Sequence, residues 1–399
     1  MQYQDIITFA QAHSTEDPLR LILQQKRYPQ IDLSLVAQQI EGQRQAQTKW
    51  PMFAACTDYF YPPKLNREQS SSEATARYKA DLFKQLQCST FADLTGGMGI
   101  DTYFIAQHAT QSAYFELNSE LFPVTQHNFS ALGLTNIVCH NTDSIQYLAD
   151  NQSTFDLILI DPARRNSTGS RVVAFEDCTP NLLDNLDLLC SRCRHLLVKA
   201  SPMIDIRQAV QQLNQVSEIH IISVGGECKE VLFLLSKETT GNTQIHCVNL
   251  ATADPTVTFT SAQENDSSPI FATAMSQYIY EPNASLMKGG CYNLLSQQYN
   301  IAKLARNTHL YTADQLIEDF PGRKFRIIQE VPLNAKEIKK IIPEGRAHVA
   351  TRNYPLAAAD LQKKLKLKEG GKLFIIAATL ASRPMGWLCE NANPGHTAI

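Results

Sequence analysis

Residues 91–101 read FADLTGGMGID: a short apolar segment, a cluster of three glycines and the start of a segment that continues through Thr102 to Gln107. This order predicts a strand, a tight turn and a helix. Glycine lets the backbone turn tightly and approach a ligand with no β-carbon in the way. The free N–H groups and positive dipole end of the following helix favour a carboxylate or phosphate. The stretch therefore predicts a site for a nucleotide-like ligand.

The spacing of the glycines separates two classes of nucleotide-binding domain. A dinucleotide fingerprint is G-x-G-x-x-G, but counted from Gly97 and Gly99 its third position falls on Thr102. The pattern Asp-x-x-x-Gly-x-Gly resembles motif I of class I S-adenosylmethionine (SAM) methyltransferases instead. A glycine turn also occurs where no ligand binds, so the interpretation depends on the residues that follow. The residues of this turn expected to hold SAM are Asp93, Thr95, Gly96, Gly97 and Gly99.

The composition is ordinary for a globular protein of several domains, with 399 residues, 44% hydrophobic and 19% charged. A net charge of -3 predicts no general attraction to nucleic acid. No apolar run approaches membrane-spanning length, and the N-terminus lacks the features of a signal peptide, so we expect a cytoplasmic protein without membrane contact. The ten cysteines are scattered, which favours reduced thiols. Cys190 and Cys193 form a lone C-x-x-C, which we interpret as packing; no metal site is expected.

Four parts can be distinguished along the chain. Residues 1–88 predict a helical N-terminal domain that covers the next one. Residues 89–262 alternate short apolar strands with helices, which predicts an α/β, Rossmann-like domain with a parallel sheet. After a polar linker at 261–268, residues 270–317 predict a small mixed module and residues 318–399 a basic domain, both small α+β domains.

The strands of the large sheet are expected at residues 90–94, 112–116, 137–140, 156–161, 195–200, 218–224 and 231–236. Only residues 225–230 join the last two, which is too short for a crossover helix, so these strands are expected to run antiparallel. Six parallel strands plus one antiparallel strand resemble the sheet of class I methyltransferases. A dinucleotide-binding domain has no need of that hairpin.

Acidic residues follow the second and third predicted strands, at the edge where open parallel sheets bind ligands. Glu116, followed by Leu117, lies 23 residues after Asp93 and can accept hydrogen bonds from a ribose. Both SAM and NAD carry that ribose, so Glu116 does not discriminate between them. Asp143 resembles the acidic residue that contacts the adenine amino group in this superfamily. It can equally cap the next helix, or do both.

Asp161-Pro-Ala-Arg164 follows the fourth strand, where these methyltransferases carry motif IV. It resembles the Asp-Pro-Pro-Arg of RNA carbon-5 uridine methyltransferases and the Asn-Pro-Pro-Tyr of N-methyltransferases but matches neither. Arg164 stands where the latter stack a base on an aromatic ring. Ser201 stands near the place of the cysteine nucleophile of the uridine enzymes. Because a hydroxyl has too high a pKa to attack as a thiolate does, carbon-5 chemistry is disfavoured.

These residues leave a carboxylate beside two guanidinium groups. Asp161 is expected to hydrogen-bond or deprotonate an acceptor nitrogen while the methyl group transfers in line. Arg164 and Arg165 can hold a phosphate or pair with Asp161, or they can only brace the loop. In the hairpin before the last strand, Cys228 and Lys229 are further candidates for substrate contact.

Long strings over nearly the whole chain carry a family resemblance. They are residues 68–79 (EQSSSEATARYK), 93–99 (DLTGGMG), 161–165 (DPARR), 225–230 (GGECKE), 278–282 (YIYEP), 307–311 (NTHLY), 321–324 (PGRK), 351–355 (TRNYP) and 370–372 (GGK). In these strings the sequence resembles a group of bacterial class I SAM-dependent methyltransferases, frequent in Bacteroidetes, with a small ferredoxin-like module and a C-terminal THUMP-like domain. The resemblance implies SAM as the cofactor and, by analogy only, RNA as the partner.

The charge distribution supports that analogy independently. Residues 318–372 hold thirteen Lys or Arg against seven Asp or Glu, a net +6 in a chain of total charge -3. Tyr354 and Phe325 are candidates to stack on bases. The basic residues expected to follow a phosphate backbone are Lys336, Lys339, Lys340, Arg346, Arg352, Lys363, Lys364, Lys366 and Lys368. The last four lysines can equally form a solvated helix face.

The sequence thus predicts a cytoplasmic SAM-dependent methyltransferase that modifies a base nitrogen in tRNA or rRNA. Two alternatives stay open: a small-molecule or protein methyltransferase, and a non-catalytic RNA-binding protein that retains a SAM fold. The sequence does not indicate the oligomeric state.

Overall fold

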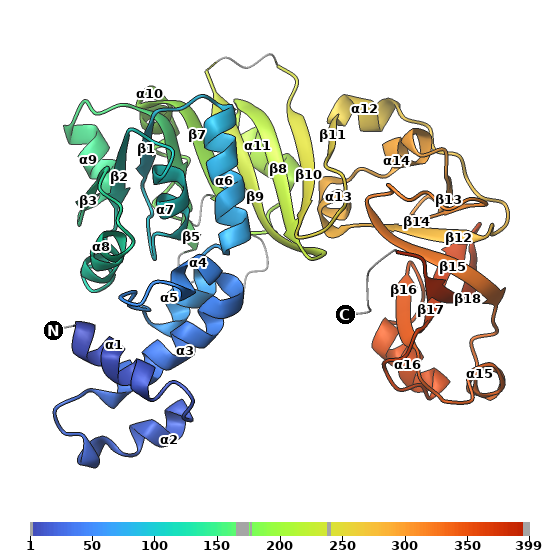
Figure 1. Ribbon diagram of the computed structural model, residues 1–399. Coiled ribbons are helices and arrows are strands. Elements are labelled where there is room, and N and C mark those ends of the chain that lie inside the picture. The colour runs from blue at the N-terminus through green and yellow to red at the C-terminus, as the bar shows by residue number, and fades with distance from the viewer. Residues whose placement is uncertain (1–2, 165–174, 176–177, 238–240, 394–399) are drawn as a thin grey trace. The chain divides into compact units, whose positions relative to one another are not determined.

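The computed structural model describes residues 3–164, 175, 178–237 and 241–393. The chain forms two compact units (Figure 1), Met1–Ser217 with Val231–Gly241, and Glu218–Glu230 with Asn242–Ile399. Among the described residues, no helix combines the length and the apolar character that crossing a bilayer requires.

Helices make up the N-terminal part of the first unit. In chain order they are α1 (Tyr3–Ala12), α2 (Pro18–Ile22), the 3-10 helix η1 (Gln25–Arg27), α3 (Leu33–Lys49), α4 (Pro51–Ala54), α5 (Lys64–Gln69) and α6 (Glu73–Gln85). The carboxylates of Asp17 and Asp32 accept backbone N–H groups at the starts of α2 and α3, and the Ser72 hydroxyl does so at the start of α6. Such caps satisfy N–H groups that have no partner within the helix.

The sheet of the first unit contains six strands in the order β9-β7-β4-β1-β2-β3. They are β1 (Thr90–Asp93), β2 (Gln111–Phe115), β3 (Ile137–His140), β4 (Phe155–Ile160), β7 (Cys193–Ala200) and β9 (Glu227–Ser236). The first five run parallel, and β9 runs antiparallel to β7. In β4, residues 157–160 are at most 1% exposed. Because successive side chains point to opposite faces, β4 is covered on both faces.

Five helices accompany these strands: α7 (Ile100–Ala106), α8 (Leu121–Ala131), α9 (Ser144–Asp150), α10 (Leu186–Ser191) and α11 (Ile206–Leu213). Of these, α7 follows the glycine turn after β1 and packs along α6 (Figure 1). Two short strands that the sequence pattern did not predict, β5 (Ala163–Arg164) and β6 (Cys178–Thr179), pair antiparallel after β4. The loops after β1, β2, β3 and β4 leave the sheet at one edge, where the predicted site residues lie.

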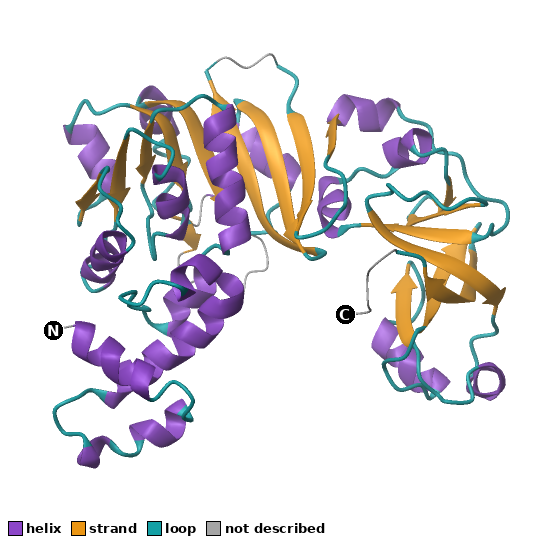
Figure 2. Ribbon diagram, viewed as in Figure 1, coloured by secondary structure: helices purple, strands orange, loops and turns teal. Residues whose placement is uncertain are grey.

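The second unit has strands β8 (Val216–Val224), β10 (Gln244–Leu250) and β11 (Val257–Thr260), in which β10 runs parallel to β8 and antiparallel to β11. It also has a seven-stranded sheet in the order β13-β14-β12-β15-β18-β17-β16 (Figure 2). Those strands are β12 (Tyr278–Pro282), β13 (Ala302–Ala305), β14 (Thr308–Ala313), β15 (Gly322–Glu330), β16 (His348–Arg352), β17 (Leu373–Leu380) and β18 (Arg383–Asn391). The helices are α12 (Ser261–Asp266), α13 (Ala284–Gly289), α14 (Asn293–Gln298), α15 (Ala335–Ile341) and α16 (Ala358–Leu365). Since β12 pairs with β15, the two predicted small C-terminal domains contribute to one sheet.

The mixed α/β class with a mixed sheet is confirmed, but two further details differ from the prediction, besides β5 and β6. Strands β10 and β11 were not predicted, and β10 provides a parallel partner for β8. Residues 261–266, predicted as part of a linker, form α12. Thr260 and Gln263 explain this helix, because each side chain accepts a hydrogen bond from the backbone N–H of the other in a capping box.

Candidate active site

Asp93 fixes the shape of the glycine turn between β1 and α7. One carboxylate oxygen accepts the Thr95 N–H at 3.1 Å, and the other accepts the Thr102 hydroxyl at 2.7 Å. The side chain is buried, and this burial raises the pKa of Asp93 to about 7, although both hydrogen bonds act in the opposite direction. Asp93 therefore contacts the turn and α7 from inside the protein.

The three glycines of the turn have different surroundings. A β-carbon on Gly96 would lie 2.0 Å from the Tyr114 ring, and one on Gly99 would lie 2.6 Å from Phe129. Gly97 has a φ of +54°, and a β-carbon there would meet only the Thr95 carbonyl oxygen, at 3.8 Å. Gly97 is thus the glycine with open space beside its Cα, although its carbonyl oxygen accepts the hydroxyls of Tyr114 and Thr125.

Glu116 lies at the end of β2, directly beside this open glycine. Its Oε2 accepts the Gly97 N–H at 2.9 Å, and its Oε1 accepts the Asn118 N–H at 2.7 Å. Leu117 is 66% exposed. A carboxylate can accept hydrogen bonds from the hydroxyl groups of a ligand, and an exposed apolar side chain can pack on a ring.

Asp143 caps α9, as one of the two sequence interpretations stated. Its Oδ1 accepts the N–H groups of Ile145 and Gln146 at 2.9 and 3.1 Å, and the side chain is exposed. The neighbouring Ser144 hydroxyl donates to the Leu94 carbonyl oxygen at 2.9 Å, which connects the end of β3 to the glycine turn. The cap leaves the adenine contact of Asp143 a prediction.

Asp161 is held against the same turn from the end of β4. Its backbone N–H donates to the Thr95 hydroxyl at 2.7 Å. The carboxylate is 40% exposed, and its Oδ2 lies 2.5 Å from the Lys199 ammonium on β7. The structure therefore brings Asp161 together with the turn, and it places a positive charge directly beside the candidate acceptor residue.

A buried charge network extends from Lys199 into the protein. Asp101 of α7 lies 3.7 Å from the Lys199 Nζ and 3.1 Å from the Nζ of Lys79, which comes from α6. The Ser71 hydroxyl donates to the same carboxylate at 2.7 Å. Burial alone raises the pKa of Asp101, but the two ammonium groups outweigh it and lower the pKa below its ordinary value. A chain of alternating charges thus connects Asp161 to the helical part.

Lys79 and Asp101 were not predicted as site residues from the sequence. The available signal was the position of Lys79 on the apolar side of its helix, among the buried residues Ala76, Ala80 and Phe83. A lysine in such a position is almost never buried without a charged partner.

Of the other predicted site residues, the structure describes Arg164, Cys228 and Lys229. Arg164 ends β5, where its backbone pairs with Cys178, and Arg165 lies outside the described residues. Cys228 and Lys229 belong to the second unit. Burial raises the pKa of the Cys228 thiol to about 11, so it is protonated at neutral pH and unsuited as a nucleophile.

Eight of the nine basic residues that were predicted to follow a phosphate backbone are exposed. Lys363 and Lys364 on α16 and Lys336 and Lys339 on α15 are exposed, as are Lys340, Arg346, Lys366 and Lys368. Arg352 is paired with Glu281, and Lys340 is paired with Glu337. The predicted stacking role of Phe325 is wrong, because Phe325 is 2% exposed and packs on Phe374 in the core of the sheet. Tyr354 is partly buried and packs against the hydrophobic cluster that includes Ile338, Leu361 and Leu365.

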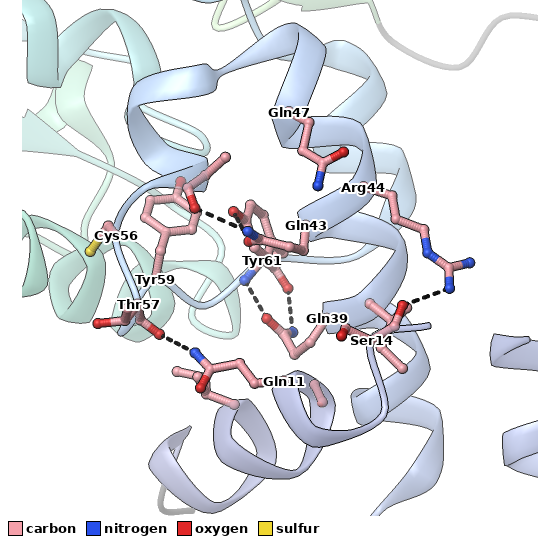
Figure 3. Close-up of a pocket in the computed structure, with 14 residues that line it drawn as sticks. Gln11, Ser14, Gln39, Gln43, Arg44, Gln47, Cys56, Thr57, Tyr59 and Tyr61 are labelled. Carbon is pink, nitrogen blue, oxygen red and sulfur yellow. Dashed lines mark hydrogen bonds between the residues drawn. The ribbon is translucent and has the colours of Figure 1, made fainter. Parts of the chain in front are cut away.

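A cavity of about 350 Å³ lies in the helical part of the first unit (Figure 3). The amides along it contact the chain itself: Gln43 bonds to the Tyr61 hydroxyl and the Ala54 carbonyl, and Gln39 exchanges two hydrogen bonds with the Tyr61 backbone. Gln11 bonds to the Thr57 carbonyl oxygen. These contacts hold the helices together, and none of the predicted site residues lines the cavity.

Comparisons with known proteins identify the C-terminal domains. Residues 278–321 match a ferredoxin-like domain family, and residues 322–391 match a THUMP domain-like family. A crystal structure from Porphyromonas gingivalis W83, provisionally named a methyltransferase, is 29% identical, with 98% of each chain covered and a TM-score of 0.87. The resemblance stated from the sequence is confirmed. The ferredoxin-like and THUMP-like domains thus follow the part of the chain that carries the glycine turn.

More distant solved structures include an rRNA methylase from Streptococcus thermophilus, at 14% identity and a TM-score of 0.30 over 40% of this chain and 94% of that one. A ribosomal protein L11 methylase from Lactobacillus delbrueckii subsp. bulgaricus gives 18% and 0.31 over 41% and 78%. Such low TM-scores carry no argument about this chain. The comparison with curated proteins gave no match.

Proposed function

We propose that this protein is a cytoplasmic SAM-dependent methyltransferase that modifies a nitrogen of an RNA base, with the THUMP-like domain binding the RNA. The observation that carries the proposal is the convergence of Gly97, Glu116 and Asp161 on one turn. Glu116 bonds to the Gly97 N–H, and Asp161 bonds through its backbone to Thr95 in the same turn. This convergence supports a cofactor position beside the position of the methyl acceptor.

The residues around the turn fit SAM. The open backbone at Gly97 accommodates the methionine end, the carboxylate of Glu116 accepts the ribose hydroxyls, and Asp143 accepts the adenine amino group. Bound SAM supplies an activated methyl group on a sulfonium. Methyl transfer requires mainly that the acceptor nitrogen be aligned with that methyl carbon, so one well-placed acceptor group suffices.

Asp161 supplies that group. Its carboxylate accepts a hydrogen bond from the acceptor N–H and takes the proton as the N–C bond forms and the S–C bond breaks. Lys199 balances the charge of Asp161 and fixes its orientation, since the ammonium is itself held by Asp101. Arg164 and Arg165 are proposed to hold a backbone phosphate of the RNA.

The RNA part of the proposal is supported by the THUMP-like domain and by the exposed lysines of α15 and α16. A flexible array of lysines binds phosphates without reading sequence. The loops around Asp161 then select the base that is methylated.

Labelled methyl transfer tests the function. Purified protein is incubated with SAM carrying a radiolabelled methyl group and total RNA from a strain that lacks the gene. We expect label in RNA with the wild type, a loss of at least 100-fold with Asp161→Ala, and no change with Asp150→Ala, an exposed aspartate at the end of α9. No label in RNA contradicts the RNA assignment, and no label in any fraction of a whole extract of the same strain contradicts catalysis.

A further inference from the structure

Two histidines and a glutamate lie together on one face of β8 and β10. Glu218 and His220 are two residues apart on β8, so their side chains share a face. His246 on β10 is the register partner of His220 in this parallel pair. The backbone register therefore brings the three side chains together.

The distances between the three side chains are those of metal ligands. Glu218 Oε2 lies 3.1 Å from His220 Nε2 and 3.3 Å from His246 Nε2. The two imidazole rings stack at 4.6 Å with an angle of 8°, and the three ligand atoms all lie within 4.8 Å of one another. A tetrahedral zinc site with bonds of about 2.0–2.1 Å has ligand atoms about 3.3–3.4 Å apart. Little movement is needed to place an ion between these atoms.

We propose that Glu218, His220 and His246 bind a divalent transition-metal ion, for which zinc is the best match. Imidazole nitrogen with one carboxylate is a donor set that zinc accepts readily. Three protein ligands leave a fourth position for water or another ligand. The side chains of Glu218 and His246 are 32% and 23% exposed, and the Nε2 atoms of His220 and His246 are buried. The bound ion would cross-link β8 to β10.

A second contact orients one of the ligands. The Thr258 hydroxyl on β11 lies 3.0 Å from His246 Nδ1, the ring nitrogen that faces away from the site. Such outer contacts fix the ring orientation of metal-binding histidines and commonly contribute 10–100-fold to affinity. All four residues belong to the second unit, whereas Gly97 and Asp161 belong to the first. A test of the metal site therefore does not depend on whether the protein transfers methyl groups.

Zinc titration of the full-length protein tests the site. The protein is stripped with a chelator and titrated with Zn²⁺ in competition with a chromophoric chelator. We expect one tight site per chain in the wild type and in the control His108→Ala, an exposed histidine elsewhere. Glu218→Gln and His246→Ala should weaken binding at least 100-fold, and Thr258→Val, which keeps all three ligands, by roughly tenfold or more.

Cobalt provides a second readout. Co²⁺ bound at the site should give the intense visible bands of a four-coordinate ion, and these should be absent in His246→Ala with unchanged circular dichroism. Equal zinc affinity in the wild type and in both ligand variants would overturn the proposal and leave the cluster as a glutamate that bridges two histidines. The same conclusion follows if zinc binds but Thr258→Val and Glu218→Gln, the two variants that preserve side-chain shape, have no effect.

Discussion

Lys79 shows how a single buried charge can connect two parts of the chain. Its side chain is fully buried, and its ammonium contacts Asp101 of α7 and, at 3.4 Å, the Ser71 hydroxyl. A buried ion pair is a weak source of stability in itself, but breaking it by removing one partner is costly, because the other charge stays behind.

Lys79→Met should therefore lower the free energy of unfolding by about 3–5 kcal/mol, measured by urea denaturation at pH 7. Lys84→Met is the matched control: Lys84 is on the same helix, 49% exposed and paired with Asp81. It should cost at most ~1 kcal/mol, as exposed pairs do. Equal losses in the two variants would contradict a buried network.

Asp93 predicts a pH dependence of stability. Its pKa in the folded protein is about 7, against an ordinary value of 3.8. Between these pH values the folded state holds a proton that the unfolded state has lost, so this residue's contribution to stability is present below about pH 4 and is lost as the pH rises to 7. Asp93→Asn removes the titration while keeping a similar shape.

The free energy of unfolding of the wild type relative to Asp93→Asn should thus fall between pH 4 and 7, by on the order of 4 kcal/mol. Urea denaturation at four pH values across this range measures it. Asp58→Asn, at an exposed aspartate, should run parallel to the wild type. A parallel profile for Asp93→Asn would show that Asp93 does not titrate in this range.

Among the elements, two glycines with the same backbone conformation distinguish the cost of backbone strain from the cost of a steric clash. Gly99 and Gly133 have nearly equal φ values of +74° and +73°, but a β-carbon on Gly99 would collide with Phe129 and Thr125, whereas one on Gly133 would meet nothing within 4 Å. Gly133→Ala should cost about 1 kcal/mol from the left-handed backbone alone. Gly99→Ala should cost roughly 1–3 kcal/mol more because it also overpacks the turn. Denaturation curves that coincide would contradict the close packing of β1 and α7 on α8.

The strands that sequence reasoning predicted best are the buried ones. Residues 157–160 form an unbroken apolar run because β4 is covered on both faces, and such runs are recognisable. By contrast, β10 mixes Gln244, His246 and Asn249 with its apolar residues, and α12 is polar except for Ala262. Both depend on tertiary pairing or capping that periodicity does not show.

The residues of the candidate site also differ in whether the sequence could predict them. Glu116 and Asp161 could be proposed from the sequence because each directly follows a strand, and topology brings strand ends together. The buried charges behind Asp161 could not, because Lys79 comes from a helix before the sheet and contacts Asp101 only in the folded protein. Phe325 was misjudged for the opposite reason: an aromatic residue in a basic segment suggests stacking, but its place in β15 points it into the core.

At the scale of the whole molecule, charge is separated along the chain. The exposed lysines of α15 and α16 lie in a chain whose net charge is -3. RNA affinity should therefore depend on this local surface and not on the overall charge. It should fall with salt, because the release of counterions gains less free energy at a higher salt concentration.

Reversing two charges tests this surface. Lys363→Glu with Lys364→Glu should weaken RNA binding and lower the slope of log affinity against log salt by about 2, measured by filter binding at several salt concentrations. Lys26→Glu with Lys64→Glu changes the net charge equally at exposed lysines of the N-terminal part and should leave the slope unchanged. Equal effects would mean that only net charge matters.

The proposed function depends most on the binding of SAM at the turn beside Glu116. Calorimetric titration of SAM into the purified protein tests it directly. We expect one site per chain, with affinity reduced roughly 10–100-fold in Glu116→Ala, since hydrogen bonds to a charged group contribute about 1.5–3 kcal/mol each. Glu120→Ala, at the start of α8 where its side chain makes no capping bond, should bind as the wild type does. No binding to the wild type, or equal binding to Glu116→Ala, would contradict the assignment of this turn as the cofactor site.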